Sequence, residues 1–312
     1  MNPFMMNTPS ADILIIGGGM AGLTAALYAL RAGKSALILE KETFGGQITS
    51  SPRVDNFPGI PAVSGNQLTD ALLSQALDLG AEIELEEIVS VHKEGDFFIA
   101  DTGKKQFFGR AVIIASGAKH RPLGVDREEQ LVGHGISYCA LCDGAFHKDQ
   151  DVAVIGGGNS ASQAAVFLSD LCKSVSVIQL FDHFTCDQKE IDAMNARSNI
   201  CLMPGYQVTA LLGENSLTGL ELTKPATDEK SVLPVEGMFV CIGRMADNEP
   251  FRDLIDLNDQ GFIVAGEDCR TNVPGIFVAG DCRVKAIRQL TTAAADGSVA
   301  AVAACSYIDS QK

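Results

Sequence analysis

Two cysteines separated by two residues, Cys139 and Cys142, have the type and spacing that most directly predict chemistry in this chain. Thiol–disulfide exchange requires one thiolate that attacks and a second thiol close enough to resolve the mixed disulfide. Two intervening residues at a loop or helix start give that reach and lower the pKa of the attacking thiol. Asp143 follows directly, and its carboxylate can carry the proton that such a step takes up or releases. We predict a redox-active dithiol with Cys139, Cys142 and Asp143 as catalytic residues.

Half of a zinc site is the competing interpretation of the cysteine pair. It would need two further ligands at matching spacing. The other seven cysteines are isolated along the chain and the five histidines show no ligand spacing, so we expect no metal. Cys282 follows Asp281 and is either an additional redox thiol or, as we favour, a small apolar core residue.

Two segments repeat the pattern that positions a dinucleotide. Each has a β-branched strand, a glycine turn (Gly17–Gly22 or Gly156–Ala161), an alanine-rich helix and a second apolar strand. In the first, the turn glycines let backbone amides approach a pyrophosphate at the helix start, and Glu40 stands where an acid binds a ribose hydroxyl. The second turn is a GxGxxA variant, which an inserted domain can keep for packing after losing its nucleotide.

A third apolar strand at residues 275–281 and an alanine-rich helix at about 290–307 end the chain. This C-terminal unit is better interpreted as a return to the first domain than as part of the second. We therefore predict an α/β protein with two Rossmann-like dinucleotide-binding domains, the second inserted into the first. The first dinucleotide-binding domain is predicted to span 1–122 plus 246–312, and the inserted NAD(P)-binding-like domain, which carries the dithiol, to span 123–245.

Composition restricts the partners and the compartment. The 312-residue chain has a formal net charge of −15, which argues against nucleic acid or an anionic membrane as the main partner. No apolar run reaches the roughly 20 residues that span a bilayer. Residues 1–7 lack the basic region of a signal peptide. Nine cysteines, an odd number, do not suggest a secreted disulfide framework, so we expect a cytoplasmic protein.

Six motifs, in order, resemble the low-molecular-weight thioredoxin reductase family, and the resemblance covers nearly the whole chain. The motifs are Gly45-Gly46-Gln47, Val54–Gly59, Ile114–Ala118, the dithiol segment Ser137–Gly144, Val278–Asp281 and Arg288–Ala293. The resemblance implies FAD as cofactor, a homodimer and a thioredoxin-like disulfide protein as partner. It also implies that Cys142 faces the flavin and Cys139 attacks the substrate, which the sequence alone does not distinguish.

The resemblance assigns cofactor-binding roles to residues of the first domain. The pyrophosphate would lie at Gly17, Gly19 and Gly22, with the adenosine ribose at Glu40. The flavin would lie near Gly46, Gln47 and Asn56, and the ribityl and phosphate region near Gly280 and Asp281. Gln289 and Leu290 would begin a helix directed at the pyrimidine ring, whose amino end favours the anionic reduced flavin.

The resemblance breaks after the second strand of the inserted domain. NADPH-using members carry His-Arg-Arg-x-x-x-Arg there to receive the 2′-phosphate, whereas this chain has Gln179, Leu180, Phe181 and Thr185 at the matching positions. Asp182 adds a negative charge, so NADPH is predicted to be a poor electron donor, unless residues such as Arg244 supply the missing charge. The chain therefore resembles ferredoxin-linked or pyridine-nucleotide-independent members, and a second nucleotide or flavin in Gly156–Ala161 stays open.

The predicted function is a disulfide oxidoreductase that passes electrons from FAD to Cys139–Cys142 and on to a thioredoxin-like protein. NADH, NADPH, ferredoxin or a second flavin stay open as the electron source. A redox sensor without turnover is the rival, and a peroxide-forming flavin oxidase would not need the dithiol. An acidic ferredoxin would need a local basic patch on this acidic chain. The candidates are Lys119, His120, Arg121 and Arg127, or Arg283, Lys285 and Arg288.

Overall fold

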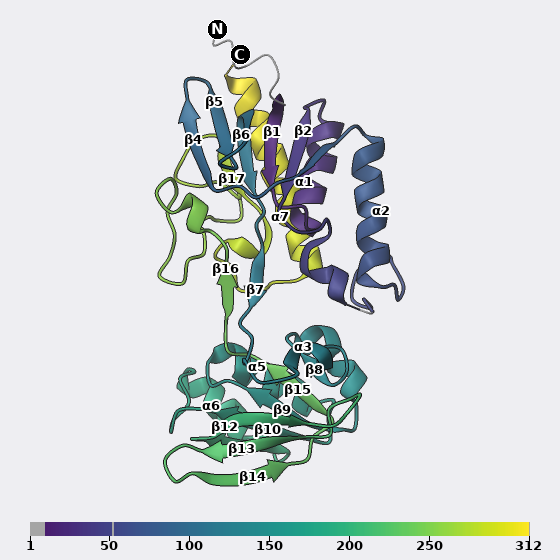
Figure 1. The fold of residues 1–312 in the computed structure, drawn as a ribbon, viewed down its shortest axis with the longest axis vertical. Helices are drawn as coiled ribbons and strands as arrows, with labels where there is room; N and C mark the ends of the chain where they lie inside the picture. The colour runs from purple at the N-terminus through teal and green to yellow at the C-terminus, as the bar shows by residue number, and fades with distance from the viewer. Residues whose placement is uncertain (1–9, 52, 312) are drawn as a thin grey trace. The chain divides into compact units, whose positions relative to one another are not determined.

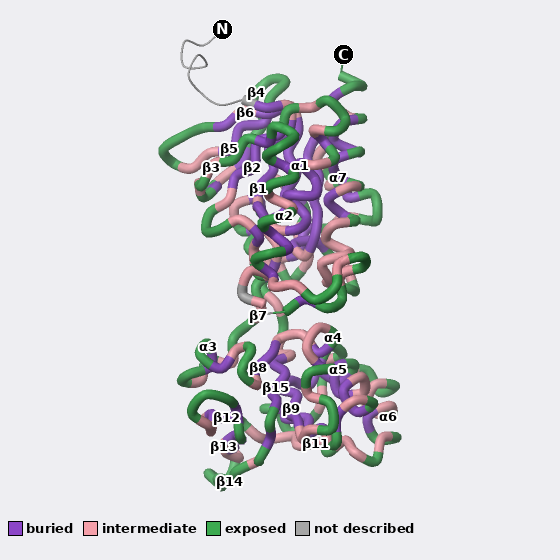
Figure 2. The backbone as a smooth tube through the Cα atoms, turned by 90° about the vertical axis from the view of Figure 1, so that its right-hand side faces the viewer, coloured by how far each residue is buried: buried purple, intermediate pink, exposed green. Residues whose placement is uncertain are grey.

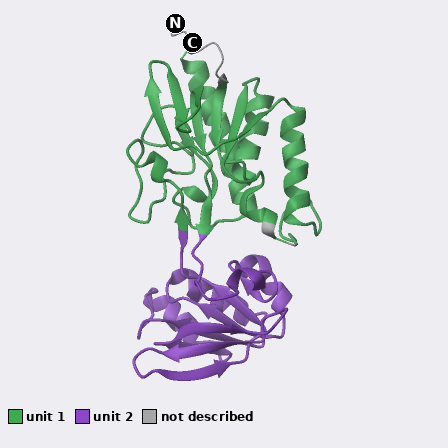
Figure 3. Ribbon diagram, in the orientation of Figure 1, with its two compact units in different colours: residues 1–119, 245–312 green, residues 120–244 purple. Residues whose placement is uncertain are grey.

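A computed structural model describes residues 10–51 and 53–311, which form two compact units (Figure 3). Unit 1 comprises the described residues of 1–119 and 245–312, and unit 2 comprises 120–244. The N-terminal heptapeptide considered above as a leader sequence lies outside the described residues. No helix within the described part of the chain is long and apolar enough to cross a bilayer.

Unit 1 is built on a seven-stranded sheet in which β3, β2, β1, β6, β5 and β4 are neighbours in that order and β17 also pairs with β6 (Figure 1). β1, β2, β3, β6 and β17 run parallel, and β4 and β5 are antiparallel additions. The elements are β1 (Ser10–Ile16), α1 (Met20–Arg31), β2 (Ala36–Glu40), η2 (Gly46–Ser50), α2 (Gly65–Asp78), β3 (Glu82–Leu85), β4 (Ser90–Glu94), β5 (Phe97–Asp101), β6 (Gln106–Ile114), η4 (Glu249–Phe251), β17 (Ile276–Val278), η5 (Gly280–Cys282) and α7 (Leu290–Ser310).

Consecutive apolar residues, whose side chains point alternately to opposite sides, give the sheet of unit 1 two buried faces. Ile13 and Ile15 of β1 point into a core that α1 and α7 cover. Leu14 and Ile16 point the other way, into a core completed by Phe98, Phe107, Phe251 and Ile263. Parallel strands that are buried on both faces read as continuous apolar runs, as β1 does.

Unit 2 has a five-stranded parallel sheet in the order β11-β10-β9-β15-β8 and a three-stranded antiparallel sheet, β12-β13-β14. Helix α5 covers one face of the parallel sheet and the antiparallel sheet packs on the other. The elements are α3 (Glu128–Leu131), β8 (Ile136–Ser137), α4 (Ala140–Asp143), η3 (Gly144–His147), β9 (Asp151–Ile155), α5 (Asn159–Ser169), β10 (Ser174–Gln179), α6 (Gln188–Asn195), β11 (Ile200–Pro204), β12 (Gln207–Leu212), β13 (Gly219–Lys224), β14 (Glu229–Leu233) and β15 (Gly237–Val240).

The predicted fold class is confirmed. Both βαβ repeats form, as β1-α1-β2 and β9-α5-β10, and the strands at their centres are buried (Figure 2). The C-terminal strand β17 pairs with β6 of the first sheet, so the chain returns to unit 1 after unit 2. Two short strands, β7 (Ala118–His120) and β16 (Arg244–Ala246), pair where the chain passes between the units. Two assignments stay predictions. One is that unit 1 binds FAD, and the other is that unit 2 is NAD(P)-binding-like, with its ligand left open.

Candidate active site

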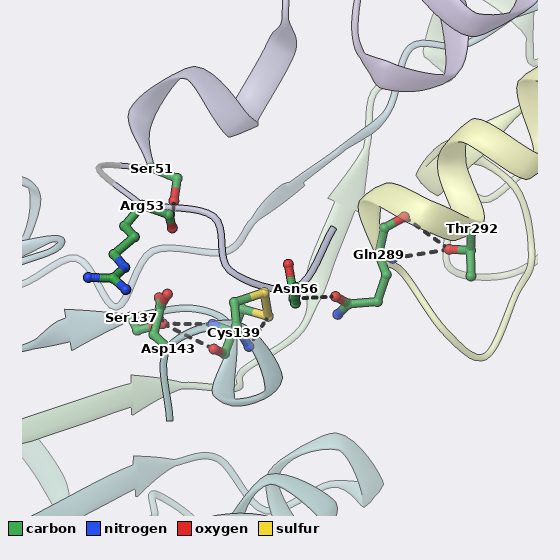
Figure 4. The surroundings of a disulfide bond; sticks show 9 residues. Ser51, Arg53, Asn56, Ser137, Cys139, Asp143, Gln289 and Thr292 are labelled. Carbon is green, nitrogen blue, oxygen red and sulfur yellow. Dashed lines mark hydrogen bonds between the residues drawn. A yellow bond between two sulfur atoms is a disulfide. The ribbon is translucent and has the colours of Figure 1, made fainter. Parts of the chain in front are cut away.

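A disulfide joins Cys139 and Cys142, whose Cα atoms are 5.3 Å apart (Figure 4). Cys139 follows β8 and caps the amino end of the short helix α4, where its sulfur accepts a hydrogen bond of 3.2 Å from the Cys142 amide. Both cysteines are half-buried. An amide that points at a sulfur stabilises its thiolate form, so the local backbone favours Cys139 as the anionic thiol after reduction.

Asp143, the last residue of α4, lies beside the cysteine pair. Burial raises the pKa of its carboxyl group, while a hydrogen bond from Ser137 and the nearby His147 oppose that rise. Because the net direction is upward, Asp143 gives up its proton closer to neutral pH than an exposed aspartate does. A carboxyl group of this kind can both donate and accept a proton in a thiol reaction.

Sequence reasoning missed the side chains that hold the dithiol segment. Ser137 Oγ accepts the Cys139 amide at 3.0 Å and donates to Asp143 Oδ2 at 2.5 Å. The Tyr138 hydroxyl donates a hydrogen bond of 2.8 Å to the Glu128 carboxylate. The same carboxylate accepts hydrogen bonds, also of 2.8 Å, from the amides of Leu123 and Gly124. A buried glutamate is rare without partners, but nothing local in the sequence identifies which donors it meets.

The Tyr138 ring also stacks on His120, with ring centroids 4.9 Å apart. Burial, together with the positive charge of Arg244, lowers the pKa of His120 to about 4. The histidine is therefore neutral near pH 7 and acts as a stacking partner. This rules it out as a contributor to a basic patch.

In unit 1, the first predicted group of cofactor residues comes together at the amino end of α1. Gly17 and Gly19 lie in the turn between β1 and α1, Gly22 lies in the first turn of α1, and Gly19 bridges to Gly45. A Cβ at Gly22 would lie 1.9 Å from the carbonyl oxygen of Gly17, so only glycine permits this turn. Glu40, at the end of β2, accepts the Gly18 amide at 2.7 Å.

The predicted flavin-contacting residues of unit 1 lie on three further segments. Gln47 is in η2 and donates to the carbonyl of Ala118. Asn56 donates to the side chain of Gln289 at 3.3 Å, and Gln289 caps α7, which Leu290 begins (Figure 4). The structure therefore brings Asn56 and Gln289 together, although 232 residues of chain separate them.

Gly280 and Asp281 are in η5, directly after β17. A Cβ at Gly280 would lie 2.9 Å from the Cβ of Ala21, so η5 packs against the first turn of α1. The neighbouring Cys282 is fully buried, its sulfur lies within reach of the carbonyls of Ile114 and Ala279, and burial raises its pKa to about 11. This environment favours Cys282 as a core residue.

A buried charged cluster, also missed by sequence reasoning, supports η5. Asp296 of α7 accepts two hydrogen bonds of 2.8 Å from Arg283, one of 2.8 Å from Lys285 and one of 3.0 Å from the Gly280 amide. The side chains of Arg283 and Lys285 are 3% and 6% exposed. The proposal that these two residues form a surface basic patch is therefore wrong, because both are committed to Asp296.

The second glycine turn, Gly156–Ala161, meets the segment that follows β10. The amides of Thr185 and Cys186 donate to the Gly157 carbonyl at 2.8 and 2.9 Å. Asp187 and Asn159 exchange hydrogen bonds of 2.9 and 3.2 Å, and Glu190 accepts from Ser162 and Gln163, each at 3.4 Å. Two carboxylates thus lie at the amino end of α5, where an incoming diphosphate would place its own negative charge.

The positions that replace the NADPH-binding arginines have mixed surroundings. Leu180 and Phe181 are 50% and 56% exposed, Thr185 is exposed, and Gln179 is buried against Gly157. Arg244, considered above as a substitute charge, lies in β16. No group of three or more metal-ligating side chains occurs among residues 10–51 and 53–311.

Known proteins resemble this chain over almost its full length. The family described as pyridine nucleotide-disulphide oxidoreductase matches residues 11–297. A thioredoxin reductase of Listeria monocytogenes is 38% identical over 302 residues, 96% of this chain and 95% of the relative. A solved thioredoxin reductase from Streptococcus pyogenes MGAS5005 has a TM-score of 0.93 and 33% identity, over 97% of this chain and 100% of that chain. A ferredoxin-flavin thioredoxin reductase from Clostridium acetobutylicum has a TM-score of 0.53 and 28% identity, over 97% and 99%.

Two βαβ units and a Cys-x-x-Cys disulfide, together with these relatives, define a flavoprotein oxidoreductase that acts on a disulfide. The chain belongs to the pyridine nucleotide-disulphide oxidoreductase family and, within it, is thioredoxin reductase-like. The resemblance predicted from the sequence is thereby confirmed, and this membership implies FAD as the cofactor.

The residues of unit 1 fit FAD. Gly45 and Gly46 have φ values of +108° and +66°, which favour glycine, and they place backbone without side chains beside Gly19 at the start of α1, Gly45 being buried and Gly46 half-buried. Among the described residues, no side chain caps the amino end of α1 and no acid lies in its first turn. An uncapped helix end next to bare backbone is what a diphosphate requires.

Proposed function

We propose that this protein reduces the disulfide of a thioredoxin-like protein through Cys139 and Cys142, with Asp143 as the acid and base. The observation that carries the proposal is the Cys142 amide directed at the Cys139 sulfur, next to a carboxyl group with a raised pKa. Bound FAD would supply the two electrons that break the Cys139–Cys142 bond. The backbone then favours the thiolate at Cys139, and Asp143 supplies the proton that makes Cys142 a thiol.

The Cys139 thiolate would attack the disulfide of the partner and form a mixed disulfide. Asp143 would then take back the proton from Cys142, whose thiolate displaces the partner and restores the intramolecular bond. This assignment agrees with the roles that the family resemblance implies for the two cysteines. In unit 1, Gly17, Gly19, Gly22 and Glu40 would hold the adenosine diphosphate part of FAD, and Gly46, Gln47, Asn56, Gly280, Asp281, Gln289 and Leu290 the remainder.

We further propose that the electron donor is not NADPH. Leu180 and Phe181 present apolar surface where a 2′-phosphate needs cations, and Asp187 and Glu190 already lie at the start of α5. The name of the Clostridium acetobutylicum neighbour makes ferredoxin the first donor to test. A cytoplasmic homodimer is the proposed form of the protein.

Anaerobic reduction of the flavin by NADPH, NADH and reduced ferredoxin, measured in parallel by the loss of flavin absorbance, tests the donor. Oxidised thioredoxin is then added to the reduced protein. We expect ferredoxin to bleach the flavin, NADPH to do so poorly, and thioredoxin to reoxidise the protein. Failure of thioredoxin to accept electrons from the reduced wild-type protein would contradict the proposed function whichever donor works.

A further inference from the structure

Ser137 occupies a position between the dithiol and Asp143 that no role described so far explains. It ends β8 and is only 5% exposed, and its hydroxyl contacts both the dithiol segment and Asp143 (Figure 4). The oxygen accepts the Cys139 amide at 3.0 Å, and the hydroxyl donates to Asp143 Oδ2 at 2.5 Å. A buried hydroxyl with two such partners links the backbone of one cysteine to the carboxyl group.

The hydrogen-bonding capacity of a hydroxyl suits both protonation states of Asp143. A serine has one donor and two acceptor positions. When Asp143 is ionised, Ser137 can donate to it across the 2.5 Å that separates the two oxygens. When Asp143 is protonated, its own O–H can donate to Ser137 Oγ, and the serine proton can turn to the Cys139 carbonyl, 3.4 Å away. The bond from the Cys139 amide is kept in both states.

We propose that Ser137 is a positioning residue that holds Asp143 in place through both halves of its proton cycle. The inference rests on the proposed role of Asp143. When two electrons break the Cys139–Cys142 bond, the Asp143 proton moves to the Cys142 sulfur, and Ser137 donates to the carboxylate left behind. When Cys142 displaces the partner, its proton returns to Asp143, and the Ser137 hydroxyl turns back to the Cys139 carbonyl.

Few other charges reach Asp143 within unit 2. His147 of η3 is the titratable side chain that acts on it electrostatically, and it favours the carboxylate. Helix α5, which also packs against α4, has no titratable side chain between Asn159 and Ser169. Within unit 2, Ser137 is the side chain seen to donate a hydrogen bond to this carboxyl group.

The test is the titration of Asp143 in the full-length protein with FAD bound. Carboxyl ¹³C NMR of aspartate-labelled protein follows the titration, and Asp143→Asn assigns the signal. We expect Ser137→Ala to raise the pKa of Asp143 by about one pH unit, because the hydrogen bond that Ser137 forms with the charged carboxylate is stronger than the one it forms with the neutral carboxylic acid. The pH dependence of single-turnover thioredoxin reduction should shift by the same amount.

Three further variants separate positioning from general disturbance of the fold. Ser137→Thr keeps a hydroxyl and should restore the wild-type titration. Ser169→Ala removes another buried serine hydroxyl of unit 2, which donates to the Val166 carbonyl at 2.7 Å, and should leave the titration unchanged. If Ser137→Ala fails to fold, Ser137→Gly repeats the measurement without a hydroxyl.

An unchanged Asp143 titration in Ser137→Ala or Ser137→Gly would overturn the inference and leave the proposed function intact. A pH profile of turnover that Asp143→Asn does not alter would instead remove Asp143 from the mechanism. The two failures are therefore distinguishable in the same set of proteins.

Discussion

The two glycine turns of this protein, Gly17–Gly22 and Gly156–Ala161, have the same backbone arrangement. They differ in the chain segment whose amides bond to the turn, which we call the crossing segment. In unit 1, the Gly45 amide donates to the Gly18 carbonyl at 2.8 Å. In unit 2, the amides of Thr185 and Cys186 make the equivalent bonds to Gly157. The crossing segment is a pair of glycines in unit 1 and carries side chains in unit 2.

Charge separates the turns further. The segment after Gly45 in unit 1, residues 46–50, contains no acidic side chain, whereas Asp187 and Glu190 meet the start of α5 in unit 2. The strand before each crossing segment ends in Glu40 in unit 1 and in Gln179 in unit 2. A shared strand-turn-helix fold therefore does not imply a shared ligand, because the residues after the second strand decide which charge the helix end meets.

The largest expected effect tests whether redox chemistry belongs to unit 2 and cofactor binding to unit 1. Cys139→Ser or Cys142→Ser should reduce thioredoxin reduction to background, because exchange needs both thiols, while FAD binding remains unchanged. Cys201→Ser, at an exposed cysteine of the same unit, is the matched control. Turnover is followed with thioredoxin and flavin content by absorbance. Full activity in either dithiol variant would exclude the proposed chemistry.

The second prediction concerns substitutions that would give the glycine turn of unit 2 the charges of an NADPH-binding site. In the wild type, NADPH should bind about a thousandfold more weakly than in a site with its arginines, since each charged hydrogen bond contributes about 1.5–3 kcal/mol. Leu180→Arg with Phe181→Arg should strengthen NADPH binding at least tenfold, and adding Asp187→Asn and Glu190→Gln should strengthen it further. Stopped-flow absorbance measures flavin reduction. Rapid bleaching of the wild type by micromolar NADPH would end the distinction drawn between the turns.

The third prediction concerns the buried cluster that supports η5 in unit 1. Burial alone would raise the pKa of Asp296, but hydrogen bonds from Arg283 and Lys285 outweigh it, and the net pKa is lowered. Asp296→Asn leaves two buried cations without their carboxylate and should cost about 3–5 kcal/mol of unfolding free energy. FAD should also be released more readily. Denaturant unfolding with FAD fluorescence measures both.

Asp309→Asn provides the control for this change on the same helix. Asp309 pairs with Lys34 at 2.7 Å and is 53% exposed, so its loss should cost less than about 1 kcal/mol. Equal costs for Asp296→Asn and Asp309→Asn would show that the buried cluster does not stabilise unit 1.

The smallest expected effect is a difference in acid sensitivity. The pKa of His120 in unit 2 is lowered to about 4, from an ordinary value of 6.5. Between these values the unfolded chain binds a proton that the folded unit does not. Stability is therefore lost as pH falls from about 6.5 to 4, by about 3 kcal/mol in total.

Denaturant unfolding of wild type and His120→Gln at pH 7 and pH 4.5 measures this contribution. The variant should lose less stability on acidification than the wild type. His92→Gln, at an exposed histidine of unit 1, is the control. Identical pH dependence in wild type and His120→Gln would contradict the low pKa.

The local features of this protein were predictable from sequence because short-range physics produces them. Apolar runs, glycine turns and alanine-rich helices specified both βαβ units. A further strand and helix after the second unit, at the C-terminus, indicated the return to unit 1. Cys139, Cys142 and Asp143 are also local, since one turn of chain brings them together.

Contacts over longer stretches of chain were decided by the tertiary structure. Arg283 and Lys285 looked like surface cations, yet both are buried on Asp296, a single acid in an otherwise apolar stretch of α7. That isolated acid was the available signal, because a buried carboxylate needs partners. No comparable signal in the sequence indicated that the carboxylates of Asp187 and Glu190 would lie at the start of α5. The sequence shows which side chains are charged. Whether a charged side chain is buried, and which partner it meets, depends on how distant segments of the chain pack.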